Sequence, residues 1–281
     1  MHELIFFSMF LLVLIRFLGV IVSVNFYYES KSSTYIYFTI GWCLWVIAGL
    51  VALISGITTN FVVESFSLLI NYLLGPLAIF FLGVGLGSYY INISSKKVKI
   101  LTVILIATPF FLNLIGQVIV ALYARFFQFF GIIEMFLLPF IRFNTFKKRI
   151  GKSIKWYYMT CFSIAIYIPL AILSMLTSLS SGSFQSQDIT IIVAAYTSII
   201  IMTILLISFI IHLEYTISSK QQNQLKDKYS HNLGNILQVI YSSSDLFKRI
   251  SKIDDKNKEK LDLIEKKCKE ASELIKEIRK L

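Results

Sequence analysis

One short stretch of the C-terminal quarter carries the residues best suited to chemistry. His231, Asn235, Gln238 and Ser242 recur at intervals of four, three and four residues, so on a helix they share one face. A neutral imidazole nitrogen is a competent nucleophile at physiological pH, because the ordinary pKa of histidine lies near neutrality. His231 is therefore a candidate nucleophile for phosphoryl transfer, provided that helices hold it in reach of solvent and partners.

Two amphipathic helices are expected to hold this face. The first carries an apolar stripe on the side opposite His231, formed by Leu225, Tyr229, Leu233, Ile236, Leu237, Ile240, Phe247 and Ile250. A turn over residues 251–257 follows, in which Asp254 or Asp255 suits the cap of the next helix. The second helix has an a/d seam, formed by Leu261, Ile264, Cys268, Ala271, Ile275 and Ile278. One hairpin buries little core, so we expect a homodimer in which two copies form a four-helix bundle.

The segment from Tyr229 to Ile240, with the sequence YSHNLGNILQVI, resembles the phosphoacceptor box of membrane sensor histidine kinases in two-component systems. The resemblance covers about residues 219–281, the counterpart of that family's dimerisation and phosphotransfer hairpin. It implies that His231 receives a phosphoryl group from ATP as a phosphoramidate. The group would then pass to an aspartate in the receiver domain of a response regulator. Asn235 matches the family position that orients water when the regulator is dephosphorylated.

Two features depart from the family pattern. Family members usually have Glu or Asp directly after the histidine, whereas Asn232 stands here and offers no negative charge. We therefore expect slower kinase-type transfer, or phosphatase or phosphorelay behaviour in its place. The family's ATP-binding domain is also missing up to Leu281, and Gly234 is the only glycine after Gly182, which leaves no glycine-rich nucleotide lid.

The chain is therefore expected to bind no cofactor and not to be self-sufficient for ATP-dependent phosphorylation. Three explanations stay open. The sequence is a truncated kinase, it uses a separate histidine kinase catalytic domain in trans, or it is a receptor whose output hairpin is degenerate. ATP would act only through the missing or borrowed domain. No metal is expected either, since no two His or Cys residues have ligand spacing.

The remainder of the chain has the composition of a membrane protein. Hydrophobic residues make up 56% and charged residues only 15%, which argues against a soluble enzyme. Seven apolar stretches are long enough to cross a bilayer: 4–28, 35–57, 64–90, 98–119, 123–143, 156–179 and 189–213. The least certain break has only Val120 to Tyr123 for its turn. We expect an all-α protein with a seven-transmembrane sensor domain at 1–216 and a cytoplasmic phosphoacceptor hairpin at 217–281.

Basic residues predict the orientation of this bundle. They collect in three alternate connections, formed by Lys31, by Lys96, Lys97 and Lys99, and by Arg142, Lys147, Lys148, Arg149, Lys152 and Lys155. Because basic loops stay in the cytoplasm, we expect a multi-pass plasma membrane protein with its N-terminus outside and its tail inside. The net charge of +11 then serves orientation and contact with membrane lipid rather than nucleic-acid binding.

A few ionisable residues inside the predicted spans suggest a sensor pocket. Arg16 and Glu134 lie near the middle of the first and fifth stretches, and a charge at that depth normally faces the bundle interior with a partner. We expect these two to pair. Glu64 and Arg125 lie near the outer face, where they could line an entrance to a ligand or ion pocket. The competing interpretation is a structural ion pair with two residues that reach the interface.

The last span has no evident stop signal. Between Gly182 and Gly234 the sequence contains neither glycine nor proline, so the seventh helix can continue into the tail and carry a movement to His231. The leading interpretation is thus a seven-helix sensor with a histidine phosphoacceptor hairpin. The alternative is a non-enzymatic receptor or transporter of seven helices, dimerised by a cytoplasmic coiled-coil hairpin.

Overall fold

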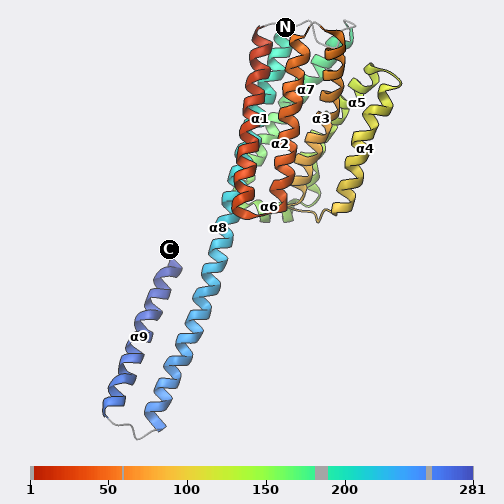
Figure 1. Ribbon diagram of the computed structural model, residues 1–281. Helices are drawn as coiled ribbons and strands as arrows, with labels where there is room; N and C mark the ends of the chain where they lie inside the picture. The colour runs from red at the N-terminus through yellow and green to blue at the C-terminus, as the bar shows by residue number, and fades with distance from the viewer. Residues whose placement is uncertain (1–2, 59, 181–188, 251–254, 281) are drawn as a thin grey trace. The chain divides into compact units, whose positions relative to one another are not determined.

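The computed structural model describes residues 3–58, 60–180, 189–250 and 255–280, and over these ranges every regular element is a helix. In chain order they are α1 (Glu3–Ser30), α2 (Ser33–Ile57), α3 (Phe61–Gly87), α4 (Ser95–Asn113), α5 (Gln117–Ile141), α6 (Phe143–Ile150), η1 (Gly151–Ser153), α7 (Ile154–Ser180), α8 (Ile189–Ile250) and α9 (Asp255–Lys280) (Figure 1). They form two compact units, here called the body (Met1–Thr216) and the tail (Ile217–Leu281). The expected all-α fold is confirmed.

Six of the described helices are long and apolar enough to cross a membrane: α1, α2, α3, α5, α7 with the short helix before it, and α8. The chain is therefore compatible with a multi-pass membrane protein. The stretch predicted as the fourth span corresponds to α4, which is not among the six. It has 19 residues, and Lys96, Lys97 and Lys99 lie near its start, so its uncharged apolar run covers only residues 100–112, which is shorter than a spanning helix needs. A seventh span thus stays a prediction.

The connection between α4 and α5 lies earlier than expected. The turn was predicted at Val120 to Tyr123, but α4 ends at Asn113 and α5 begins at Gln117. Gly116 makes the turn possible with a φ of 157°, a value that glycine adopts without a Cβ penalty. The prediction is wrong because Leu114 and Ile115 are apolar and extend the apolar stretch, although they lie in the connection between the helices.

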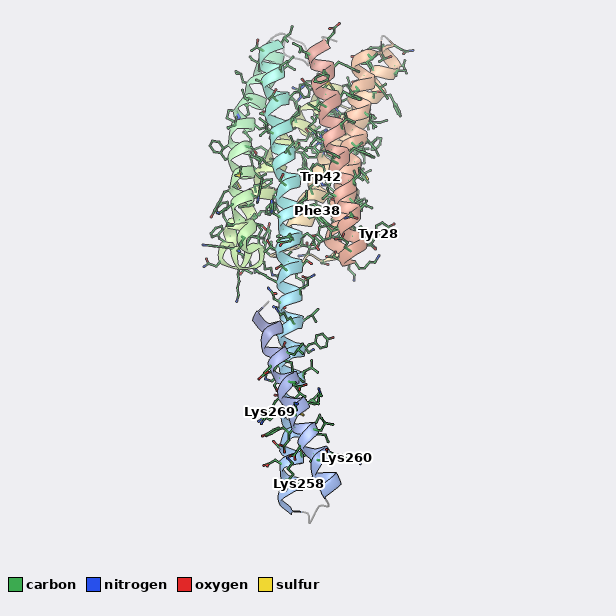
Figure 2. The ribbon with its side chains drawn as sticks, turned by 90° about the vertical axis from the view of Figure 1, so that its left-hand side faces the viewer. Tyr28, Phe38, Trp42, Lys258, Lys260 and Lys269 are labelled. Atoms are coloured by element: carbon green, nitrogen blue, oxygen red, sulfur yellow. The ribbon has the colours of Figure 1, made fainter. Side chains whose placement is uncertain are left out.

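The first three helices pack side by side in the body (Figure 1). Side-chain caps define where α2 and α3 begin. At α2 the Ser32 hydroxyl accepts a hydrogen bond from the Thr34 amide, and at α3 Asn60 Oδ1 accepts one from the Val62 amide at 3.0 Å. The contact between α1 and α2 is close, because a Cβ on Gly19 would lie 2.6 Å from the Trp42 ring. Phe38 and Trp42 point into the body while Tyr28 points out of it (Figure 2).

At one end of the body, here called the basic end, α1 ends, α2 begins and the lysine-rich segment between α5 and α7 lies (Figure 1). That segment was expected to be a loop. It forms α6 and η1 instead, because Phe146 and Ile150 are one turn apart and both become buried, while Lys147, Lys148 and Arg149 fill the polar side.

Candidate phosphoacceptor site and its supporting contacts

The candidate nucleophile lies on a helix, as its spacing requires. α8 runs without a break from Ile189 to Ile250, which confirms the continuous helix expected from the lack of glycine and proline. His231, Asn232, Asn235 and Gln238 are all exposed on it. Beside His231 lies a shallow groove of about 410 Å³, lined by Asn235, Gln238, Val239, Ser242 and Ser243. Of the polar residues singled out by their spacing, Asn235, Gln238 and Ser242 therefore line this groove, and His231 contacts it through Asn235.

Asn235 contacts the imidazole directly. Its side-chain Nδ2 lies 3.3 Å from Nδ1 of His231, a contact that the helical i, i+4 spacing makes possible. An amide in this orientation donates to an unprotonated Nδ1; turned by 180°, its oxygen accepts from Nδ1–H and leaves the lone pair on Nε2. The contact thus couples the tautomer of His231 to the orientation of the Asn235 amide, and the tautomer decides which ring nitrogen has a lone pair.

We therefore expect Asn235→Ala to change phosphorylation at His231 rather than abolish it. Loss of the amide leaves both imidazole tautomers populated, which should slow labelling by about twofold to tenfold, the equivalent of one modest hydrogen bond. The rate of ³²P incorporation in the presence of a catalytic domain measures this. Gln238→Ala is the matched control, since it removes an exposed amide of the same face that makes no contact with the ring among the described residues; an equal effect of both variants would contradict the assignment.

The two arms of the tail are held by contacts around Lys248 and Cys268. Nζ of Lys248 lies 2.5 Å from Asp262 and 2.9 Å from Glu265. Cys268, from the predicted seam, is 7% exposed, and the Lys269 ammonium lies 5.9 Å from the Tyr241 ring centroid. These contacts pair the end of α8 with α9, as in the expected hairpin. The predicted turn residue Asp254 lies outside the described residues.

The Lys248 contacts predict a pH-dependent hairpin. Hydrogen bonding to Lys248 lowers the pKa of the Asp262 carboxyl below its usual value. Its stabilising contribution is therefore present above the ordinary carboxyl pKa of about 3.9 and is lost as pH falls through the lowered value. Lys248→Ala at pH 7, or acid strong enough to protonate Asp262, should speed hydrogen exchange of the α9 amides, after correction for intrinsic rates. Lys228→Ala is the control; unchanged α9 protection in Lys248→Ala would contradict this.

The apolar stripe of the first arm has little cover within one chain. Leu225, Tyr229, Leu233, Ile236 and Ile240 are between 41% and 64% exposed. Leu237 is half-buried, whereas the side chains of Phe247 and Ile250 lie outside the described residues. Exposed aliphatic residues at helical spacing over four turns are typical of a surface that packs against another helix.

Arg16 is buried in the body but not in the way the sequence suggested. It is 6% exposed, and its guanidinium carbon lies 4.2 Å from the Trp45 ring centroid while Nη1 donates to the Trp45 carbonyl at 3.3 Å. Tyr167 and Tyr196 lie within its electrostatic range. A cation on an aromatic face is stabilised by the ring quadrupole. Trp45 therefore supplies the partner that a buried arginine requires.

The expected Arg16–Glu134 pair is wrong. Glu134 lies on an exposed face of α5, and within the described part of the chain neither residue has an ion-pair contact with the other. Arg125 is, like Arg16, in electrostatic range of Tyr167 and Tyr196, whereas Glu64 is exposed. The structure thus brings the two arginines to a common pair of tyrosines and leaves the two carboxylates apart.

Sequence reasoning missed a second polar cluster, here called the collar, which surrounds α8 at the basic end. Tyr35 of α2 donates to the carboxylate of Glu214, and Tyr89 donates to the Tyr35 hydroxyl at 3.1 Å. Arg149 in turn donates to the Tyr89 carbonyl at 2.7 Å. Glu214 is 9% exposed. A buried carboxylate with a hydrogen-bond partner is costly to disturb, so this contact fixes α8 against α2.

The other side of the collar comes from η1 and α7. Ser153 Oγ lies 2.8 Å from the His212 carbonyl and 2.9 Å from the Thr216 hydroxyl. The His212 ring stacks on Trp156 with centroids 4.6 Å apart. Glu214 within an apolar run and the aromatic Tyr35 were the only sequence signals. Both look like ordinary interfacial residues until the fold brings them together.

Comparisons with models of protein families, with curated proteins and with solved structures found no match.

Proposed function

We propose that the chain is a membrane signal transducer whose tail carries a phosphoryl group on His231. The observation that carries this proposal is an exposed histidine whose Nδ1 contacts Asn235 at 3.3 Å on the open face of a helical hairpin. This arrangement suits a nucleophile that must meet two large partners in turn. The donor is a histidine kinase catalytic domain with ATP, and the acceptor is the receiver domain of a response regulator.

The tail acts as a homodimer in this proposal. Two hairpins that bring their exposed stripes together would bury the side chains of Leu225, Leu233 and Ile236, which are 49% to 56% exposed in one chain. Burying a leucine or isoleucine side chain fully is worth about 1.5–3 kcal/mol. A four-helix bundle thus removes an apolar surface that would otherwise face water, while His231 stays on the outer face.

The body supplies the signal through α8. The collar fastens α8 at His212, Glu214 and Thr216, and the boundary between body and tail follows directly at Thr216. A rearrangement that breaks the Tyr35–Glu214 contact would free α8 to turn or shift, and an unbroken helix transmits such a motion. In this proposal the body has seven spans and its basic end faces the cytoplasm, so the tail lies inside the cell, at the plasma membrane.

The experiment supplies the catalytic domain as a separate protein. The full chain, in lipid nanodiscs, is incubated with [γ-³²P]ATP and a soluble histidine kinase catalytic domain, beside a kinase hairpin that this domain labels. We expect label that is lost in acid and retained in base, and that moves to an added receiver domain. A labelled control hairpin with an unlabelled chain would favour the non-enzymatic receptor or transporter.

A further inference from the structure

An aromatic groove with one carboxylate runs along α5 in the body. Its volume is about 290 Å³, and it is lined by Tyr123, Phe126, Phe127, Phe130, Gly131 and Glu134. These residues recur at helical spacing, so they form a single stripe on one helix. From Tyr123 to Glu134 the stripe extends over eleven residues, or about 16 Å of helix rise. The groove is therefore long and narrow, with its carboxylate at one end.

The surroundings of the Glu134 carboxylate favour a cation beside it. Glu134 lies within the apolar span Val118–Ile141, is exposed on the outside of the body, and has no ion-pair partner among the described residues. Exposing an ionised carboxylate to lipid within an apolar span costs free energy. A positively charged group beside Glu134 would remove much of that cost.

The aromatic rings favour the same kind of occupant. Phe126 and Phe130 stack with centroids 6.2 Å apart and are 48% and 58% exposed, while Tyr123 and Phe127 have centroids 6.0 Å apart. Ring faces attract organic cations, quaternary ammonium above all, and also offer an apolar surface for a hydrocarbon chain. The groove thus combines an apolar track with a negative end.

We propose that this groove binds an amphiphilic organic cation: a lipid-like amine or quaternary ammonium whose hydrocarbon chain lies along the Phe126 and Phe130 rings and whose charged nitrogen pairs with Glu134. The site opens to the lipid phase, so such a ligand would enter from the bilayer. This inference is independent of the phosphoryl transfer proposed for His231, because it concerns binding alone.

Dodecyltrimethylammonium is a suitable probe, because its charge does not depend on pH. Radiolabelled probe is added to the full chain in nanodiscs, with empty nanodiscs as background. We expect saturable binding that weakens about tenfold in Glu134→Gln and about threefold in Phe130→Leu. Glu29→Gln and Phe66→Leu, which change an exposed carboxylate and an exposed ring elsewhere in the body, are the matched controls and should bind as the wild type does.

Competition and cross-linking decide between occupants. Neutral dodecanol and anionic dodecyl phosphate should displace the probe at least tenfold less well than unlabelled dodecyltrimethylammonium. Equal competition by dodecanol, or wild-type binding in Glu134→Gln, would overturn the proposal. So would absence of saturable binding together with disulfide cross-links between copies of Glu134→Cys, since the groove would then be an interface between two chains. None of these readouts depends on His231 phosphorylation.

Discussion

Replacing His231 by glutamine should reduce acid-labile phosphate on the chain to background. Glutamine keeps a side chain of similar size on the exposed face of α8 but has no nucleophilic ring nitrogen. Because the imidazole is exposed and its hydrogen-bond contact among the described residues is with Asn235, the substitution should not disturb the helix. The measurement is ³²P incorporation in nanodiscs with ATP and the separate catalytic domain, before and after mild acid.

The matched controls use the other histidines of the chain, His2 and His212. His212→Gln should still carry acid-labile phosphate, because it leaves the His231 imidazole in place; as the His212 ring stacks on Trp156 in the collar, this control is scored by the presence of the label and not by its rate. His2→Gln should keep it as well. Undiminished labelling in His231→Gln would place the phosphate elsewhere and contradict the assignment of the site.

Two glycines in the exposed part of α8 should separate the collar from the tail. Glycine is less favourable in a helix than alanine by about 1 kcal/mol per residue, so the double substitution Gln222→Gly and Asn223→Gly creates a flexible point between Glu214 and His231. The collar variant Glu214→Gln, which weakens the Tyr35 contact, should change the rate of His231 labelling severalfold in an otherwise native chain. With the two glycines present, Glu214→Gln should no longer have this effect.

This design needs no knowledge of the natural stimulus, since Glu214→Gln replaces it. The double substitution of Gln222 and Asn223 by alanine is the control: the helix stays continuous, and the response to Glu214→Gln should persist. If the response survives both the glycine and the alanine pair, α8 does not act as a stiff connection. If Glu214→Gln has no effect in the native chain, the collar does not control the tail.

The fold could be predicted from the sequence where one local signal dominates. Long apolar runs predict helices of membrane length, and the absence of glycine and proline predicts the continuous α8. The α4–α5 turn shows where this fails. Leu114 and Ile115 are apolar yet lie in the connection, because Gly116 supplies the φ of 157° that ends one helix and allows the next.

The candidate site, like the fold, could be predicted from the sequence only in part. The common face of His231, Asn235 and Gln238 follows from helical periodicity alone. The partner of Arg16 does not follow from periodicity, since it depends on how α1 and α2 are rotated against each other. Matching depth in the membrane points to Glu134, whereas the fold places the guanidinium over the ring of Trp45. The Tyr35–Glu214 contact joins residues that are 179 positions apart in the sequence, and no local sequence pattern predicts such a pair.

The most direct test is to find the phosphorylated residue in the wild-type chain. Trypsin cleaves after Lys228 and Lys248, which releases a peptide of residues 229–248 with His231 as its only histidine. After labelling with ATP and a separate catalytic domain, we expect the acid-labile phosphate in this peptide, and its loss when a receiver domain is added. Two results would contradict the account. One is phosphate in the peptide that contains His212, and the other is a 229–248 peptide without phosphate in an experiment that labels the control hairpin.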